Sequence, residues 1–254
     1  MRRAKDLVRV FELDPDLLAG QDERTAAHLR VRMVAQRIWA EPGPWHAERD
    51  ARDLQGGLGL LVLDGLLVRT TQVSAHTCAE IVGPGDLLRP PDGEPSGGST
   101  GCVSRWRVLQ PTMLAVLDGA FAARLACWPG IAAAFLERSM RRSRALAHQT
   151  AIAGIRQAQA RVLLSLWHLA DRWGRVTPEG VALTLPLTHQ LLAQVTCLRR
   201  PTVSGALGQL ARAGRLSRLP GGGWLLHGAP PGTPATAAVA ATIFAGPHGA
   251  PAEA

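Results

Sequence analysis

The stretch LRRPTVSGALGQLARAG, residues 198–214, decides the fold that the sequence predicts. Its pattern predicts a helix that begins near Arg199, with Pro201 in the first turn, where a missing N–H is harmless. Apolar residues at spacings of three and four would form its buried stripe, namely Val203, Leu207 and Leu210. The other side carries small or cationic residues, namely Arg200, Pro201, Ser204, Gly205 and Gly208. A smooth helix face led by arginine fits the major groove of DNA, which is about 12 Å wide.

The neighbouring segments complete a winged helix-turn-helix pattern. Thr188 can cap a helix over HQLLAQVT, residues 189–196, and GRLSRLPGGGWLLHG, residues 214–228, is typical of a hairpin with a glycine-rich turn. No Asp or Glu occurs in residues 180–252, and the chain has a formal net charge of +8. Such charge of one sign indicates a polyanionic partner, because arginines that contact phosphates release counterions. An ordinary helical hairpin with incidental arginines is the alternative.

Changes in composition divide the rest of the chain. Residues 1–40 predict an N-terminal helical arm, and residues 41–127, with short apolar runs around Asp-Gly and Gly-Pro-Gly-Asp turns, predict a β-roll. Residues 128–157 predict one long helix, and residues 158–228 the winged helix-turn-helix domain. Residues 229–254 are rich in Ala, Pro and Gly and predict a disordered tail. The expected fold class is therefore α+β.

The long helix over residues 128–157 has one side on which apolar residues recur, and arginines dominate elsewhere. That side comprises Ile131, Phe135, Ser139, Arg142, Leu146, Ile152 and Ile155. At 1.5 Å per residue the helix would span roughly 40 Å, more than a compact domain needs. We therefore expect it to be a dimerisation helix that pairs with the same helix of a second copy. A solitary linker helix packed on the β domain is the alternative.

These motifs resemble those of the Crp/Fnr (cyclic AMP receptor protein-like) family of bacterial transcription regulators. The resemblance is most specific over residues 161–228, where LTHQLLAQ, RRPTVSGALGQLARAGRL and GGGWLLHG are similar to the helix-turn-helix and wing of that family. It extends more weakly over residues 14–157, where GLLVLDGLLVRT and VGPGDLLRP resemble its cyclic-nucleotide-binding-like β-roll. The resemblance implies a cytoplasmic, homodimeric, sequence-specific DNA-binding regulator, with double-stranded DNA as partner and RNA polymerase as a further candidate.

The resemblance also assigns residues to DNA. Arg200 matches the arginine that contacts a guanine edge, Ser204 lies on the same face, and Arg218 lies in the wing. Pro201 stands where many relatives have a base-reading glutamate, and Gly205 where the cyclic AMP receptor protein has a further base-reading arginine. These departures change the expected half-site. The positions that match phosphate contacts are Thr188, His189, Gln190, Arg199 and Thr202.

The effector is less well defined. In cyclic-nucleotide-binding relatives a Gly-Glu pair and an Arg-Ser or Arg-Ala pair follow the Gly-Asp turn. Glu94 matches the first pair, nothing matches the second, and Arg105 and Arg89 are its substitutes, so Glu94 and Arg105 are the candidate effector residues. Two prolines in this segment would remove backbone donors that cradle a phosphate. A cyclic nucleotide is thus a candidate ligand, and the effector is unknown or absent.

The cysteines indicate no cofactor. The four cysteines are far apart in the sequence. None forms a C-x-x-C pair or precedes residue 78, as an N-terminal iron-sulfur sensor would require, so they are expected to be reduced and mostly packing residues. Cys197 replaces a turn glycine of the family, and we expect a slightly different turn there. Haem ligation by His46 or His76 stays open.

Two other function classes compete with the regulator. An enzyme is not expected, because the sequence shows neither a catalytic constellation nor a phosphate-cradling motif. A membrane partner is not expected either, because the sequence has no apolar segment of 18 residues. A degenerate relative that binds nucleic acid non-specifically, or that serves as a protein-interaction module, is the remaining alternative.

Overall fold

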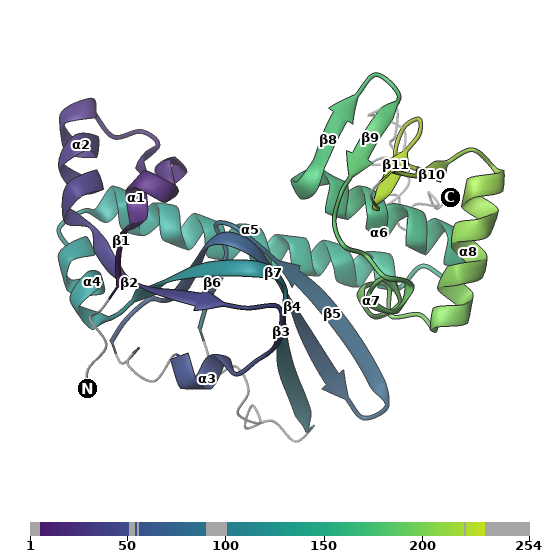
Figure 1. Ribbon diagram of the computed structural model, residues 1–254, viewed down its shortest axis with the longest axis horizontal. Helices are drawn as coiled ribbons and strands as arrows, with labels where there is room; N and C mark the ends of the chain where they lie inside the picture. The colour runs from purple at the N-terminus through teal and green to yellow at the C-terminus, as the bar shows by residue number, and fades with distance from the viewer. Residues whose placement is uncertain (1–5, 51–53, 55, 90–100, 221, 232–254) are drawn as a thin grey trace, which may run out of the picture. The chain divides into compact units, whose positions relative to one another are not determined.

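The computed structural model describes residues 6–50, 54, 56–89, 101–220 and 222–231, and its elements have the α+β class that the sequence predicted (Figure 1). The chain forms two compact units. Of the described residues, those up to Gly154 together with Pro186–Pro201 form the first unit, and Ile155–Leu185 together with those from Thr202 onward form the second. The tail predicted over residues 229–254 lies outside the described residues from 232 onward. None of the described helices has the length and hydropathy of a membrane-spanning segment.

An antiparallel sheet forms the centre of the first unit, in the order β1-β2-β7-β4-β5, with β3 on β7 and β6 on β4. β4 and β7 pair along most of their length. The β-roll that the sequence predicted is confirmed. Its strands are β1 (Leu7–Arg9), β2 (Val34–Ala40), β3 (Gly43–Trp45), β4 (Gly59–Val73), β5 (His76–Val82), β6 (Leu87–Leu88) and β7 (Cys102–Leu117), and a short helix, α3 (Ala47–Asp50), follows β3.

One of the two expected turns is a different structure. Asp64-Gly65 does not end a strand, because it forms a β-bulge inside β4. Gly65 has φ +91°, and a Cβ there would lie 2.3 Å from the carbonyl oxygen of Pro111, so only glycine fits this close approach. The Gly-Pro-Gly-Asp segment does turn: Oδ2 of Asp86 accepts the N–H of Gly83 at 2.9 Å.

The N-terminal arm is not purely helical, and this corrects the interpretation of residues 1–40. It contains α1 (Val10–Leu13), the 3-10 helix η1 (Pro15–Leu18) and α2 (Glu23–Arg32), but also β1 and β2. β2 is a strand because it pairs with β7, a long-range contact that the local pattern did not reveal. The N-cap of α2 is Asp22, and the hydrogen bond that it accepts from the backbone of Thr25 lowers the pKa of its carboxyl group.

The long helix packs on the rest of the first unit. It does so with the apolar side that we expected to face a second copy of the chain. α5 (Pro129–Ala153) follows α4 (Gly119–Leu125) and buries Ile131 and Phe135 in a core with Phe11, Phe121 and other residues of the arm and the sheet. Ile152 is buried as well. The apolar ends of the predicted row on α5 therefore face its own unit, while Ser139 in the middle of the row is exposed, and the homodimer has to be argued from another face.

The second unit contains most of the predicted winged domain. α6 (Ala158–Trp173) buries an apolar stripe that includes Val162, Leu166 and Leu169, and the turn at Pro178-Glu179 joins β8 (Gly174–Thr177) to β9 (Gly180–Leu183). From Thr202 onward the unit continues with the rest of α8 (Arg200–Arg212), with β10 (Leu216–Arg218) and with β11 (Trp224–Leu226). Its sheet has the order β10-β11-β9-β8.

α7 (His189–Val195) departs from the predicted grouping of residues 158–228. It belongs to the first unit, where it packs near β5 and where the amide of Gln149 donates to the carbonyl of Val195 at 3.0 Å. The sequence could not show this, because the amide donor and the carbonyl lie 46 residues apart.

Candidate nucleic-acid interface

α7 begins as the sequence predicted. Thr188 is its N-cap, and its hydroxyl oxygen accepts the N–H of Leu191 at 3.1 Å. The helix buries Leu191, Leu192, Ala193 and Val195. Among the candidate phosphate contacts, Thr188 and Gln190 are exposed and His189 is partly exposed. These three side chains are therefore accessible at one end of α7.

The turn after α7 is tightly bonded. The N–H of Leu198 donates to the carbonyl of Ala193 at 2.9 Å, and the hydroxyl of Thr196 donates to the carbonyl of Leu192 at 2.7 Å. Cys197 has φ +51°, which is the left-handed conformation that favours glycine. The turn thus keeps the conformation of a glycine turn although it carries a side chain.

α8 follows directly and has the predicted buried stripe. Val203, Leu207 and Leu210 are buried, and Ala206 joins them. Pro201 lies in the first turn, as expected, and Pro201 and Thr202 are exposed. One side of α8 therefore belongs to the interior, and the candidate reading face is the other side.

That reading face, which we define as Arg200, Pro201, Ser204, Gly205 and Gly208, is open. Gly205 and Gly208 are exposed, and a Cβ built at either would have no heavy atom within 4 Å. Packing within the described chain therefore does not require these glycines. Each one in a helix interior destabilises the protein by roughly 0.5–1 kcal/mol relative to alanine. A surface outside the chain that must approach closely would explain both.

Positive charge lies at the start of this face. Arg199 and Arg200 are exposed, and among the residues that the structure describes neither forms an ion pair. The sequence has no acidic residue from 180 to 252 that could neutralise them locally. Both guanidinium groups are free to meet phosphates or base edges.

The wing adds a third arginine. β10 and β11 pair in the register that puts Arg218 opposite Trp224, and the guanidinium lies over the indole ring, 3.7 Å from its centroid. Arg218 is exposed, while Trp224 is buried. The sequence analysis missed the role of Trp224, although its place across the hairpin from Arg218 was a usable signal.

His227 also escaped the sequence analysis. Its Nε2 lies 2.9 Å from the hydroxyl oxygen of Ser217, and its Nδ1 lies 3.0 Å from the carbonyl oxygen of Glu179. One imidazole thus connects the wing to the β8–β9 turn and supports the position of the hairpin.

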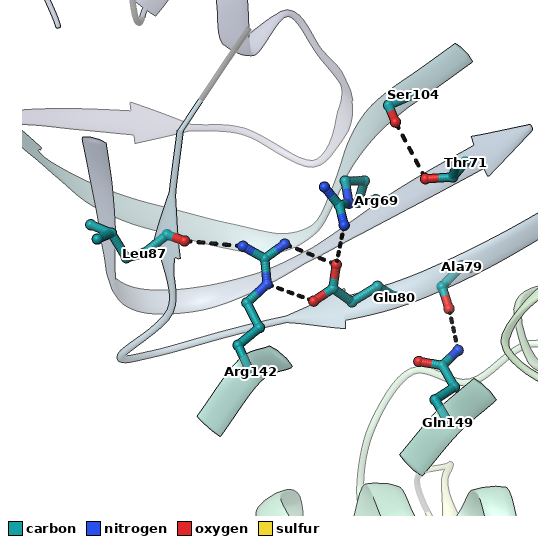
Figure 2. A network of polar contacts seen from close by, with 8 residues as sticks. All are labelled: Arg69, Thr71, Ala79, Glu80, Leu87, Ser104, Arg142 and Gln149. Atoms are coloured by element: carbon teal, nitrogen blue, oxygen red, sulfur yellow. Dashed lines mark hydrogen bonds and ion pairs between the residues drawn. The ribbon is translucent and has the colours of Figure 1, made fainter. Parts of the chain in front are cut away.

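A polar network in the first unit connects α5 to the β-roll. Arg142 donates to both carboxylate oxygens of Glu80, at 2.6 and 2.9 Å, and to the carbonyl of Leu87 at 3.0 Å (Figure 2). Arg69 approaches the same carboxylate at 3.1 Å. The three ionised side chains are mostly buried, with 12–22% of each exposed. Arg142 belongs to the predicted row of α5, but no sequence pattern indicated this network.

Of the two candidate effector residues, the structure describes only Arg105. Glu94 lies outside the described residues. Arg105 lies opposite Thr70 in the register of β4 and β7, so the two side chains share one face of the sheet, where Arg105 donates to Gln72 at 3.2 Å. Arg69 is the neighbour of Thr70 on β4 and pairs with Glu80, so Arg69 and Glu80 lie on the opposite face. The structure does not bring Arg105 to Glu80, and its role as an effector contact stays a prediction.

Comparison with known proteins identifies one domain of the chain. The family model of the Crp-like helix-turn-helix domain matches residues 160–227. No curated protein sequence matches significantly. The matched residues include α7, α8 and the wing, so the comparison identifies this part of the chain as a helix-turn-helix domain of the Crp-like type.

Three solved structures illustrate the shared fold. A mutant of CooA from Carboxydothermus hydrogenoformans is 16% identical, with a TM-score of 0.59 over 88% of this chain and 93% of that one. A cyclic nucleotide-binding domain containing protein from Listeria monocytogenes is 15% identical, with a TM-score of 0.60 over 75% and 88%. CLP of Xanthomonas campestris, described as a c-di-GMP responsive global regulator, is 15% identical, with a TM-score of 0.54 over 77% and 95%. Residues 160–227 thus contain a Crp-like helix-turn-helix domain, and the chain shares its fold with these solved structures.

Proposed function

We propose that the chain is a homodimeric, sequence-specific transcription regulator whose α8 enters the major groove of DNA. The observation that carries this proposal is the open reading face, on which Arg200 precedes two exposed glycines with free space above them. Arg200 donates to the O6 and N7 atoms of a guanine, and the glycines let the helix approach the base edges.

The other candidate residues would hold the protein on the backbone of the duplex. Such contacts position the reading helix and carry no sequence information. We assign Arg218 to a phosphate beside the wing, where its stacking on Trp224 keeps the guanidinium in place. The remaining phosphate contacts are assigned to Thr188, His189, Gln190, Arg199 and Thr202.

Selection of duplexes from a random pool, followed by fluorescence anisotropy, tests the assignment of the reading helix. Arg200→Ala is expected to remove about 1–3 kcal/mol, which is roughly 5- to 150-fold in Kd, from the selected site and little from random duplex. Arg218→Ala is the matched control, because it should weaken both duplexes equally. If Arg200→Ala left the ratio of the two Kd values unchanged, α8 would not be the reading helix.

Non-specific binding to nucleic acid is the second candidate function, and two positions of the reading face favour it. Pro201 and Gly205 carry no side chain that can donate to or accept from a base edge. Measurement at equal salt separates the candidates, because a specific regulator binds its site roughly 10³-fold or more tighter than random duplex. Equal affinity for both duplexes would favour the non-specific module.

The homodimer would use the outer face of α5. Leu136 and Met140 are 62% and 49% exposed there, and Ser143 and Ala147 continue the row at helical spacing with exposed side chains. Large exposed apolar side chains in a row on a long helix are typical of an interface between helices. A second copy of α5 presents the same row, so the surface is complementary to itself under twofold symmetry.

Sedimentation velocity tests this interface. The double substitution Leu136→Glu and Met140→Glu is expected to give monomers with weaker binding to a palindromic site, whose half-sites lie about one helical turn apart. Ala145→Glu is the matched control, because Ala145 is exposed half a turn away from Leu136. A dimer that survives the double substitution would place the interface elsewhere.

The effector of the β-roll is proposed only as a class. A cyclic nucleotide is the candidate that the fold suggests, and CLP shows by its description that c-di-GMP serves one relative of this fold. A thermal-shift panel of cyclic mononucleotides and dinucleotides checks it, since a ligand that binds only the folded state raises Tm. RNA polymerase is a further candidate partner, and a DNA-binding regulator of this kind acts in the cytoplasm.

A further inference from the structure

Two cysteines that are far apart in the sequence meet in the first unit. Cys78 lies on β5, Cys197 lies in the turn after α7, and their Sγ atoms are 2.7 Å apart across 119 residues of sequence. Both side chains are exposed, and neither cysteine forms a disulfide bond. The cysteines, which we expected to be mostly packing residues, therefore include one pair that meets in space.

The amide of Gln149 holds the two segments together. Its Nε2 donates to the carbonyl of Ala79 at 2.8 Å and to the carbonyl of Val195 at 3.0 Å (Figure 2 shows the bond to Ala79). Ala79 follows Cys78 directly, and Val195 lies two residues before Cys197. A single side chain of α5 thus fixes the distance between the backbones that carry the thiols.

Cys197 has a backbone conformation that is unfavourable for a residue with a side chain. Its φ of +51° is left-handed, and a residue with a Cβ is less stable there than glycine by roughly 1–2 kcal/mol. The turn alone would be more stable with glycine. The thiol therefore has to be explained by something other than the stability of the turn, and its partner in space is Cys78.

We propose that Cys78 and Cys197 form a dithiol site that reacts with hydrogen peroxide and closes to a disulfide within one chain. A disulfide needs an S–S distance of about 2.05 Å, so the sulfur atoms have to approach by roughly 0.7 Å, which side-chain rotation provides. The thiols face a cavity of about 210 Å³ that Thr71, Leu146 and Thr150 also line, and it admits a small oxidant. In reducing cytosol such pairs are transient and sense oxidants.

The reaction balances with peroxide as the only oxidant. One thiolate attacks a peroxide oxygen, the O–O bond breaks, and a sulfenic acid and hydroxide form; the hydroxide takes up the thiol proton and leaves as water. The second sulfur attacks the sulfenic sulfur, the S–O bond breaks, and a second water leaves with the remaining thiol proton. Two electrons pass from the sulfur atoms to peroxide, and an added dithiol reverses the reaction by exchange.

The bond would fix the segment that leads into α8. Arg200 follows Cys197 by three residues and belongs to the same unit as β5. On the proposed function, oxidation therefore ties the start of the reading helix covalently to a strand of the β-roll. The disulfide itself is tested without DNA, so its failure and that of the proposed function can be told apart.

The test uses the full chain with Cys102→Ser and Cys127→Ser, which leaves only the pair. After peroxide treatment, thiol titration should fall from two per chain to none, and the intact mass should drop by two hydrogens. Peptide mapping should find Cys78 linked to Cys197, and dithiothreitol should restore both thiols. A gain of oxygen mass without this link, or a disulfide between two chains, would overturn the proposal.

Two further variants keep the test sharp. Cys197→Gly removes one thiol and supplies the residue that the turn favours, so it should fold and leave Cys78 unable to form a link within the chain. Gln149→Ala keeps both thiols but removes their brace, and we expect disulfide closure to slow by about tenfold or more, because positioning accounts for the rate. Closure at an unchanged rate in Gln149→Ala would contradict the positioned pair.

Discussion

Replacing the two exposed glycines of α8 by alanine should stabilise the free protein. Gly205 and Gly208 lie inside a helix of 13 residues, neither has a left-handed φ, and an added Cβ meets no atom within 4 Å. Alanine therefore gains helix propensity without a clash. Most single substitutions in proteins destabilise, so a gain at two neighbouring positions would be distinctive.

The magnitude follows from helix propensity. Each substitution should add roughly 0.5–1 kcal/mol to the free energy of unfolding, and the double variant about 1–2 kcal/mol. For a chain of this size, 1 kcal/mol moves Tm by roughly 2–4 °C, so the double variant should melt about 2–8 °C higher. Gly214→Ala is the matched control: its Cβ also meets nothing, but φ is +65°, so the same substitution should lower Tm.

Calorimetry and DNA binding together check the reasoning. If α8 lies in the groove, Gly205→Leu should raise Tm but weaken binding to the selected duplex, because a long side chain holds the helix away from the base edges. Stability and affinity would then change in opposite directions. A lower Tm for Gly205→Ala would mean that the face is packed inside the molecule. Unchanged affinity for Gly205→Leu would mean that it does not touch DNA.

Two ion pairs of the first unit give further predictions. Arg138 donates to both carboxylate oxygens of Asp14, at 2.5 and 2.6 Å, and both side chains are about nine-tenths buried. Arg138→Ala should therefore reduce the free energy of unfolding, measured by urea denaturation, by about 3–5 kcal/mol. A loss under about 1 kcal/mol would contradict this. Glu80→Gln leaves Arg69 and Arg142 without their shared counter-charge and should reduce the free energy of unfolding by about 3 kcal/mol. A melting curve like that of the wild type would show that the network does not support the fold.

Local sequence patterns predicted local structure well. The stripe of α8 followed from apolar spacing, and Thr188 as N-cap followed from its hydroxyl before an apolar run. The apolar periodicity also predicted the apolar side of α5, but it could not show whether this side packs on the same chain or on a second copy. A helix that packs on the core of its own chain and a helix that packs on a second copy show the same apolar spacing. In the structure, Ile131 and Phe135 pack in the core of their own chain.

Long-range pairings were beyond reach because no local pattern encodes them. The partners Arg142 and Glu80 lie 62 residues apart, and Cys78 and Cys197 lie 119 apart. Asp64-Gly65 has the composition of a hairpin turn, and only its pairing with β7 shows that it is a bulge.

The segment 197–208 carries three residue choices that oppose the stability of the free chain. Cys197 has a left-handed backbone conformation, and Gly205 and Gly208 interrupt a helix interior where alanine would fit. Together they lower stability by roughly 2–4 kcal/mol, a sizeable part of the 5–15 kcal/mol of a typical domain. Sequences that agree with their fold elsewhere depart from it mainly where function requires. Because α8 has its buried stripe intact, the departures concern only what this segment presents outward: a thiol to β5 and a smooth face to a partner outside the chain.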